Sequence, residues 1–331
     1  MDLNRRNSVL IAIAGAVLAC QPAWAAQSAA SASSARRNGK VTMYKDRALS
    51  FAIDETKGHL LSFKNGREFI VEDEKQSLFS LQFRNATGVP LRFYSNQASE
   101  FDAKRVDEPG LTRFTLSYKK IAPHPQGYFE RDINATVSIE CPHDTGMTYW
   151  RIDVDFKSLP LYMLEFIEFP RVTLPNEFAA EGGDLDLFWP FSEGCLVTDP
   201  GSRWHPYRPV EYPSGGGYGM YPGPLQMQYM SVQSPAGGLY MASHDAAHAP
   251  KEIEYLRTGK GVRLIYKVFT GAAEESYRMP YPMVLGGFTG DWHDAARIYR
   301  DFATSDEVIT TPKLKNNPKM TDWLKESPVV C

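Results

Sequence analysis

Apolar and polar side chains alternate with a period of two over much of residues 41–288. This period places every second side chain on one face of a β-strand, whereas a helix needs a period near 3.6. Turn signals such as Lys64-Asn65-Gly66 and Glu108-Pro109-Gly110 separate the runs. The alternation is clearest in residues 49–53, 79–83, 114–118, 135–141, 150–156 and 262–268. The pattern predicts an all-β chain with antiparallel sheets.

Composition supports one large sandwich and excludes some functions. Aromatic residues make up 12% of the 331 residues, and there are 25 Gly and 23 Pro, as is typical of turn-rich β proteins. The strand-rich region is much longer than an immunoglobulin-like sandwich of about 100 residues, so a large antiparallel β-sandwich with many strands is expected. The net charge of -3 shows no basic footprint for nucleic acid or anionic lipid.

The N-terminus has the pattern of an export signal. Arg5 and Arg6 precede the apolar run 8–19, and Ala23-Trp24-Ala25 offers a cleavage site. The run is too short to span a bilayer, and no other segment is apolar enough. We therefore expect a signal peptide over 1–25, a disordered Ala/Ser-rich leader over 26–40, and a periplasmic or extracellular location. The export route and lipidation of Cys20 stay open.

The remaining cysteines do not predict a disulfide framework. Cleavage leaves Cys141, Cys195 and Cys331, an odd number. Cys141 ends an alternating run and is expected to be a buried thiol.

One amphipathic helix is expected after the sandwich. Apolar residues from Trp292 to Phe302 recur at helical spacing, and Asp291 with Asp294 approximates a capping box. The helix over 289–304 should pack on the sandwich domain (41–288), and residues 305–331 look like a linker.

Several segments together resemble a known family. They are 49–54 with 60–65 and 79–83, Phe191-Ser192-Glu193-Gly194 with Asp199-Pro200-Gly201, Tyr221-Pro222-Gly223 with 227–230, Gly237-Gly238-Leu239-Tyr240 with His244-Asp245, and Gly290-Asp291-Trp292 through Asp294-Ala295-Ala296 to Tyr299-Arg300. In this order they resemble a glycoside-hydrolase-like family defined as a domain of unknown function. The resemblance implies a galactose-mutarotase-like supersandwich that the C-terminal helix links to a (β/α)₈ barrel.

The resemblance also implies a division of labour. Trp323-Leu324 and Val329-Val330 are similar to the start of the barrel, and the sequence stops there. Glycosidases use paired carboxylates, which in barrel enzymes lie at strand ends. The catalytic residues therefore stay unknown, and whether the chain is itself an enzyme stays open. The expected function is a non-catalytic N-terminal domain that shapes a substrate cleft and braces the barrel. The alternatives are a stand-alone sugar epimerase or polysaccharide lyase, and a periplasmic structural or binding module.

Candidate substrate-binding residues concentrate in an aromatic stretch, 186–222. Aromatic rings stack on the apolar faces of pyranoses, and neighbouring polar groups fix hydroxyls. The stretch could equally clasp the barrel. The candidates are Trp189, Glu193, Trp204, His205, Tyr207, Tyr212, Tyr218 and Tyr221, with His244 and Asp245 further along the chain.

No metal or cofactor is expected. His244 and His248 have ligand-like spacing, but no third ligand is evident. Phosphate-binding Gly loops, zinc-type Cys pairs and a G-x-S-x-G motif are absent from the sequence. The expected partner is an oligosaccharide or polysaccharide, and an apolar patch facing the barrel would favour association.

Overall fold

The computed structural model describes residues 41–71, 77–121, 133–157, 159, 161–178, 183–198, 200, 216–273, 275–310 and 316–326. The predicted signal peptide and leader, and the candidates Trp204, His205, Tyr207 and Tyr212, lie outside these residues.

The largest sheet, sheet I, has ten strands in the order β14-β13-β16-β17-β21-β10-β9-β8-β7, with β20 also paired to β10. Its pairings are antiparallel. The strands are β7 (Ala98–Glu108), β8 (Leu111–Ile121), β9 (Ile133–Pro142), β10 (Met147–Asp155), β13 (Asp186–Trp189), β14 (Cys195–Val197), β16 (Tyr229–Ser234), β17 (Gly237–Ser243), β20 (Ser276–Arg278) and β21 (Met283–Phe288).

Sheet II has seven strands in the order β15-β18-β19-β11-β5-β6, with β12 paired to β19. Its pairings are antiparallel too. The strands are β5 (Ser80–Asn85), β6 (Pro90–Tyr94), β11 (Tyr162–Glu168), β12 (Val172–Pro175), β15 (Gly216–Tyr221), β18 (Lys251–Arg257) and β19 (Gly261–Ala272). A short 3-10 helix, η1 (Ser95–Gln97), connects β6 to β7.

A smaller sheet III, in the order β1-β2-β3-β4, precedes both in the chain. Its strands are β1 (Val41–Lys45), β2 (Ser50–Asp54), β3 (Leu60–Asn65) and β4 (Arg67–Glu68). The Asn65 side chain ties it to sheet I by donating to the carbonyls of Gly238 at 3.0 Å and Phe288 at 2.5 Å. Gly66 has φ +73°, and a Cβ there would lie 1.8 Å from the carbonyl oxygen of Ala236. This close approach requires a glycine.

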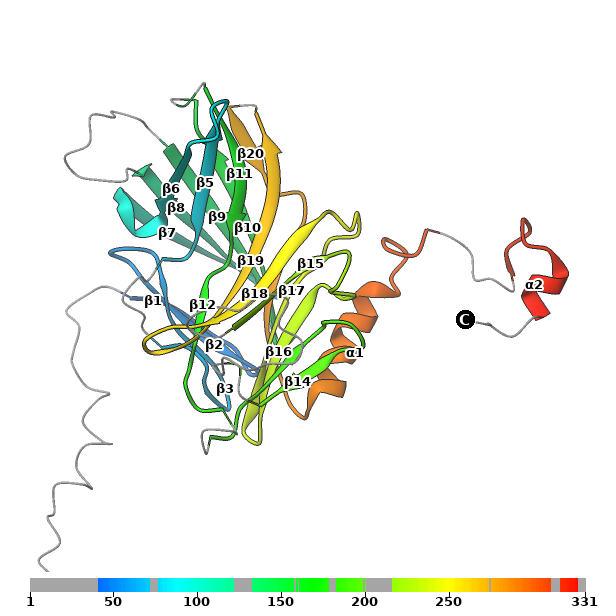
Figure 1. Ribbon diagram of the computed structural model, residues 1–331. Helices are drawn as coiled ribbons and strands as arrows, with labels where there is room; N and C mark the ends of the chain where they lie inside the picture. Colours follow the sequence, from blue (N-terminus) through cyan, green and yellow to red (C-terminus); the bar gives the residue numbers. More distant parts are fainter. Residues whose placement is uncertain are drawn as a thin grey trace, which may run out of the picture. The chain divides into compact units, whose positions relative to one another are not determined.

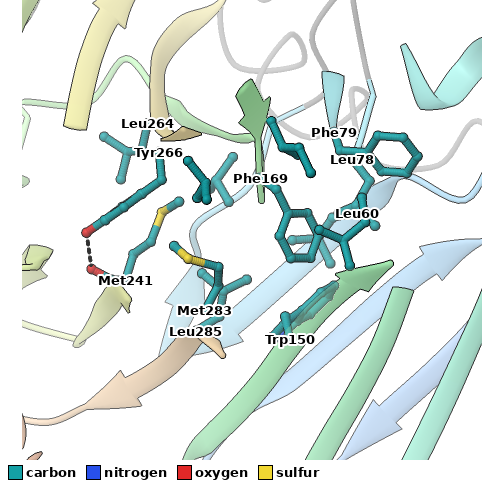
Figure 2. Close-up of a cluster of buried hydrophobic side chains, with 14 of the residues drawn as sticks. Leu60, Leu78, Phe79, Trp150, Phe169, Met241, Leu264, Tyr266, Met283 and Leu285 are labelled. Atoms are coloured by element: carbon teal, nitrogen blue, oxygen red, sulfur yellow. Dashed lines mark hydrogen bonds between the residues drawn. The ribbon is translucent and has the colours of Figure 1, made fainter. Parts of the chain in front are cut away.

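The inner faces of the sheets form one continuous hydrophobic core. In β9 and β10, buried residues alternate with partly or fully exposed ones, as the period of two predicts. Figure 2 shows part of the core, where Trp150 of β10 lies among side chains of several strands. The Tyr266 hydroxyl is a paired polar group in this core, because it donates to the Met241 carbonyl at 2.8 Å. The predicted buried thiol, Cys141, is fully enclosed, and burial raises its pKa.

The C-terminal helix α1 (Trp292–Ala303) packs on the outer face of sheet I, near β16 (Figure 1). Asp291 caps it by accepting from the backbone N–H of His293 at 2.9 Å, and Asp294 completes the capping box. Its buried side chains join a second apolar cluster, in which Tyr229 stacks on Tyr299 with centroids 4.9 Å apart. A short helix, α2 (Asp322–Glu326), follows. The predicted class, an antiparallel sandwich with one C-terminal helix, is confirmed.

Candidate functional site

The outward face of sheet II carries two rows of side chains that cross its strands in register. The first row is Tyr94, Ser80, Glu168, Lys267 and Glu252, on β6, β5, β11, β19 and β18. The second row is Arg92, Gln82, Phe166 and Phe269, on β6, β5, β11 and β19. The intervening residues of these strands, Leu81, Phe93, Ile167, Val268 and Ile253, are in the core, so both rows point away from it. We call these rows, with Arg171, Glu165 and Glu254, the charged face.

Glu168 is the centre of the charged face. Its side chain is only 4% exposed, although it points away from the core. One carboxylate oxygen pairs with Arg92, and the other accepts from the Ser80 hydroxyl at 2.9 Å and lies 3.4 Å from Nε of Arg171. The carboxylate therefore holds two guanidinium groups over the same point of the sheet.

Arg171 reaches this point from the connection between β11 and β12. Its backbone N–H donates to the Leu78 carbonyl at 2.9 Å, which fixes the start of the side chain. Its guanidinium lies 5.3 Å from the ring centre of Tyr94 and donates to the Ser77 hydroxyl. Burial lowers the pKa of Arg171, and the negative charge of Glu168 opposes this. The side chain is 6% exposed, and its Nε–H makes no hydrogen bond within the described residues.

A second ion cluster continues the face. Lys267 pairs with Glu252 and lies 3.0 Å from Glu254. Burial lowers the pKa of Lys267, but attraction to Glu254 and Glu252 outweighs it, and the net pKa is raised. Phe166 lies between the clusters, with Arg92 5.7 Å and Lys267 6.0 Å from its ring centre. These distances are typical of cation–π contacts.

Charges buried on an outward sheet face are costly and not required by the core. Taking paired ions out of water rarely gains stability over apolar packing. Such groups are therefore candidates for a functional role. The charged face offers guanidinium donors, carboxylate acceptors and aromatic rings together, which is the set of groups that holds a polyhydroxylated ligand.

The structure brings Tyr221 and Asp245 from the predicted candidates into one buried polar network. Asp245 is 2.9 Å from Nζ of Lys251, whose side chain has no exposed surface, and accepts from the backbone N–H groups of Ala247 and Ala249. Lys251 also donates to the side-chain oxygen of Gln228 at 3.0 Å. These contacts fix the turn between β17 and β18.

Tyr221 and His248 extend the network toward the surface. The Tyr221 hydroxyl lies 2.6 Å from Nδ1 of His248, and the amide nitrogen of Gln228 lies 3.3 Å from the same atom. Burial raises the pKa of Tyr221 to about 12, so the hydroxyl is neutral.

His244 does not share this network through its ring. Its Nε2 is 3.1 Å from the Tyr240 hydroxyl, and its ring stacks on Phe302 of α1 with centroids 4.3 Å apart. Burial lowers the pKa of His244 to about 4, so the ring is neutral near pH 7. The Asp245 carboxylate bonds Lys251 and backbone amides, so these neighbours do not form an acid–base pair.

The other described candidates are dispersed. Trp189 is fully buried, stacked 4.8 Å from Phe191 and edge-on to Tyr255, which corrects its expected role as an accessible sugar platform. Its place on β13 in the core explains the aromatic side chain. Glu193 is exposed at the β13–β14 turn, where the hydrogen bond from Ser192 lowers its pKa. Tyr218 is half-buried on β15, in register with Glu254, and so extends the charged face.

Sequence reasoning missed most of the charged face. The only signal in the sequence was the set of polar residues that alternate with the core residues along each strand. Glu252 and Glu254 flank a core residue, Ile253, and Lys267 lies between two other core residues, Tyr266 and Val268. Charged residues on the solvent side of a strand are ordinary, so only the pairing of the strands reveals that these converge.

Two kinds of feature are absent from the described part of the chain. No helix there is long and apolar enough to cross a bilayer. No three His, Cys, Asp or Glu side chains in the same residues gather as metal ligands.

Comparison with known proteins supports the fold. No protein-family model and no curated protein matches the chain. Among solved structures, the α-N-acetylgalactosaminidase NagBb from Bifidobacterium bifidum bound to GalNAc matches with TM-score 0.53 and 10% identity over 79% of this chain and 38% of that one. Its complex with Gal-NHAc-DNJ gives TM-score 0.54 and 10% identity over the same shares. A putative aldose 1-epimerase from Escherichia coli K12 gives 0.44 and 11% identity, over 76% of this chain and 99% of that one.

The chain thus spans about 38% of the length of the glycosidase structures that it matches. At about 10% identity, the likeness shows a shared fold.

Proposed function

We propose that this protein is an exported, carbohydrate-active sandwich whose charged face binds saccharide. In a glycoside hydrolase, it would be a non-catalytic domain that forms one wall of the substrate cleft and braces a barrel. The observation that carries the proposal is the buried Glu168–Arg171 pair on the outward face of sheet II. Two further groups of the same face, Arg92 and Tyr94, contact this pair.

The chemistry of the face suits sugar hydroxyls. A hydroxyl both donates and accepts, so it can bond a guanidinium and a carboxylate at once. Of the two guanidinium groups that pair with Glu168, that of Arg92 belongs to a side chain that is 35% exposed, so it is the one that a ligand oxygen can reach. The Tyr94 and Phe166 rings supply apolar surface beside these donors.

The fold and the N-terminus give independent support. The glycosidase structures that share the fold act on sugars, and the chain corresponds to a part of them. The predicted export signal at Arg5, Arg6 and Ala23-Trp24-Ala25 fits a protein that meets polysaccharide outside the cytoplasm. Intact-mass measurement of the protein from the periplasm and medium tests this part. Retention of residues 1–25 in all fractions would contradict it.

Titration calorimetry of the full chain against a saccharide panel tests the binding. Arg92→Gln should weaken binding about tenfold or more, because it removes a charged donor and leaves Glu168 less well paired. Arg113→Gln is the matched control, since Arg113 is likewise paired with glutamate, here Glu108 and Glu140, but lies on sheet I. Equal affinities of both variants and the parent would contradict the proposed site.

The non-catalytic role has its own test. We expect the purified chain to hydrolyse no aryl glycoside, because a glycosidase needs two available carboxylates. The glutamates of the charged face, Glu165, Glu168, Glu252 and Glu254, are each in an ion pair with an arginine or a lysine. Turnover that co-purifies with the chain through two columns would overturn this role while leaving the binding site standing.

The epimerase or lyase alternative finds less support. It would use His244 with an acid, yet the His244 ring meets Tyr240 and Phe302, and Asp245 is engaged by Lys251. Following the anomeric signals of galactose and glucose by NMR with the protein present tests it. Faster anomerisation that survives His244→Gln would point to another base in the chain.

A further inference from the structure

One outer strand of sheet I has a long free edge. Among the described residues, β7 pairs only with β8, and it ends the sheet (Figure 1). It is 11 residues long, contains no proline, and pairs with β8 from Ala98 to Glu108 without a shift of register. A strand of this kind presents a row of unpaired backbone N–H and C=O groups along its free side.

The other outer strands of sheets I and II carry features that hinder further pairing. At the opposite end of sheet I, β14 has only three residues. In sheet II, β6 begins with Pro90, and β15 has three glycines among its six residues. Short length and proline protect a sheet edge, and glycine weakens a strand. Of these four outer strands, β7 is therefore the one best suited to accept a further strand.

We propose that β7 is a dimer interface, at which it pairs antiparallel with β7 of a second copy of this chain. A two-fold axis at Ala103 relates the two copies, so the same strand serves on both sides. Sheet I then continues from one copy into the other. This inference is independent of the charged face, which lies on sheet II.

The length of β7 and its charges favour the same register. Ala103 is the middle residue of β7, so an axis there opposes the whole strand to its copy. Asp102 and Lys104 flank Ala103, both are exposed, and neither is in an ion pair within the described residues. In this register, Asp102 of each copy faces Lys104 of the other, which makes two cross-strand ion pairs. An axis one residue away would set Asp102 or Lys104 against itself.

Other charges of β7 are held within one copy and leave the edge open. Glu100 pairs with Lys120 at 2.6 Å. Arg105 lies 3.0 Å from Asp107, and its guanidinium donates to the Met43 carbonyl at 2.7 Å. These contacts hold the Arg105 side chain over its own copy. The unpaired charges next to Ala103 are thus the ones available to a second copy.

Sedimentation of the full chain, from low to several hundred micromolar, tests the interface. We expect a monomer–dimer equilibrium. Asp102→Lys sets two pairs of lysines against each other and should weaken the dimer about tenfold or more. Adding Lys104→Asp to Asp102→Lys restores two opposite-charge pairs and should restore the parent's dimerisation. Asp306→Lys is the matched control, because it makes the same charge change at an exposed residue after α1.

Disulfide trapping tests the register. Residues directly opposite each other in an antiparallel pair have Cα atoms about 4.5–5.5 Å apart, which a disulfide can bridge. Ala103→Cys should therefore form a covalent dimer on air oxidation, and peptide mass mapping should find residue 103 of both copies in the bond. Ser99→Cys should form no such bond, because Ser99 faces Asp107 of the other copy in this register.

Three results would overturn the proposal. The first is a monomer at every concentration, and slow amide exchange along β7 in that monomer would show that another part of the chain covers the edge. The second is a dimer of Asp102→Lys as stable as that of the parent, which would place the interface elsewhere. The third is trapping through Ser99→Cys and not through Ala103→Cys, which would exclude the axis at Ala103.

Discussion

Replacing Lys251 with methionine should destabilise the fold strongly. The Lys251 side chain has no exposed surface, and its Nζ donates to Asp245 at 2.9 Å, Gln228 at 3.0 Å and the Ala249 carbonyl at 2.6 Å. Methionine fills a similar volume but leaves the Asp245 carboxylate, 3% exposed, without its cation. Removing one partner of a buried pair costs about 3–5 kcal/mol. At about 2–4 °C per kcal/mol, the Tm should fall by roughly 10 °C.

Urea unfolding of matched variants measures this cost. Lys157→Met is the control, because its pair with Asp155 is 4.0 Å long and both side chains are largely exposed. The control should change the free energy of unfolding by less than about 0.5 kcal/mol. Adding Asp245→Asn to Lys251→Met should recover part of the loss, since it removes the stranded charge. A loss below about 1 kcal/mol for Lys251→Met would refute the assignment of this pair as a buried, charged clasp.

Three more changes test other parts of the structure. The pKa of His244 is about 6.5 in the unfolded chain and about 4 in the fold, so the neutral ring stabilises the fold fully above pH 6.5, and about 3 kcal/mol of the free energy of unfolding is lost as the pH falls toward 4. His244→Gln should therefore flatten the pH dependence of urea unfolding between pH 6.5 and pH 4. The same pH dependence in the variant and the parent would contradict the buried neutral ring. Gly66→Ala should lower the free energy of unfolding by at least about 1 kcal/mol more than Gly88→Ala, because both glycines have positive φ but only Gly66 faces a backbone oxygen. Equal melting temperatures of the two variants would contradict this close approach. Asp291→Ala should cost about 1 kcal/mol through the lost helix cap, and an unchanged Tm would count against the capping box.

The fold could be predicted because its signals are local. Alternation within one strand reports which side chains enter the core, and each alternating run from Leu49 to Val268 matches a strand to within one residue at its ends. The helix was predictable for the same reason, since Asp291 and the apolar face of α1 lie within a few turns. Neither signal depends on knowing which strands are neighbours.

The charged face depends on strand pairing and could not be predicted in the same way. Arg92 and Glu168 are far apart in the chain and meet because β6 pairs with β5 and β5 with β11. A period of two also places Leu164 and Phe166 on one face, but the intervening bulge sends Leu164 into the core and Phe166 to the outer face. The bulge has no local sequence signature.

The predicted aromatic stretch shows a second limit of composition. Aromatic residues are equally suited to sugar stacking and to cores. Trp189 proved to be a core residue, whereas Tyr218 of the same stretch lies on the charged face. The difference is set by strand parity and by which sheet each strand joins. Trp204, His205, Tyr207 and Tyr212 stay predictions.

Hydrogen–deuterium exchange of the full chain, with and without a saccharide that binds, tests the central claim most directly. It locates the ligand without any substitution. We predict slower exchange in peptides from β6, β11 and β19, which carry Arg92, Glu168 and Lys267, and no change in β8 and β9 of sheet I. Protection confined to sheet I, or to the turn between β17 and β18, would contradict the assignment of the charged face as the saccharide site.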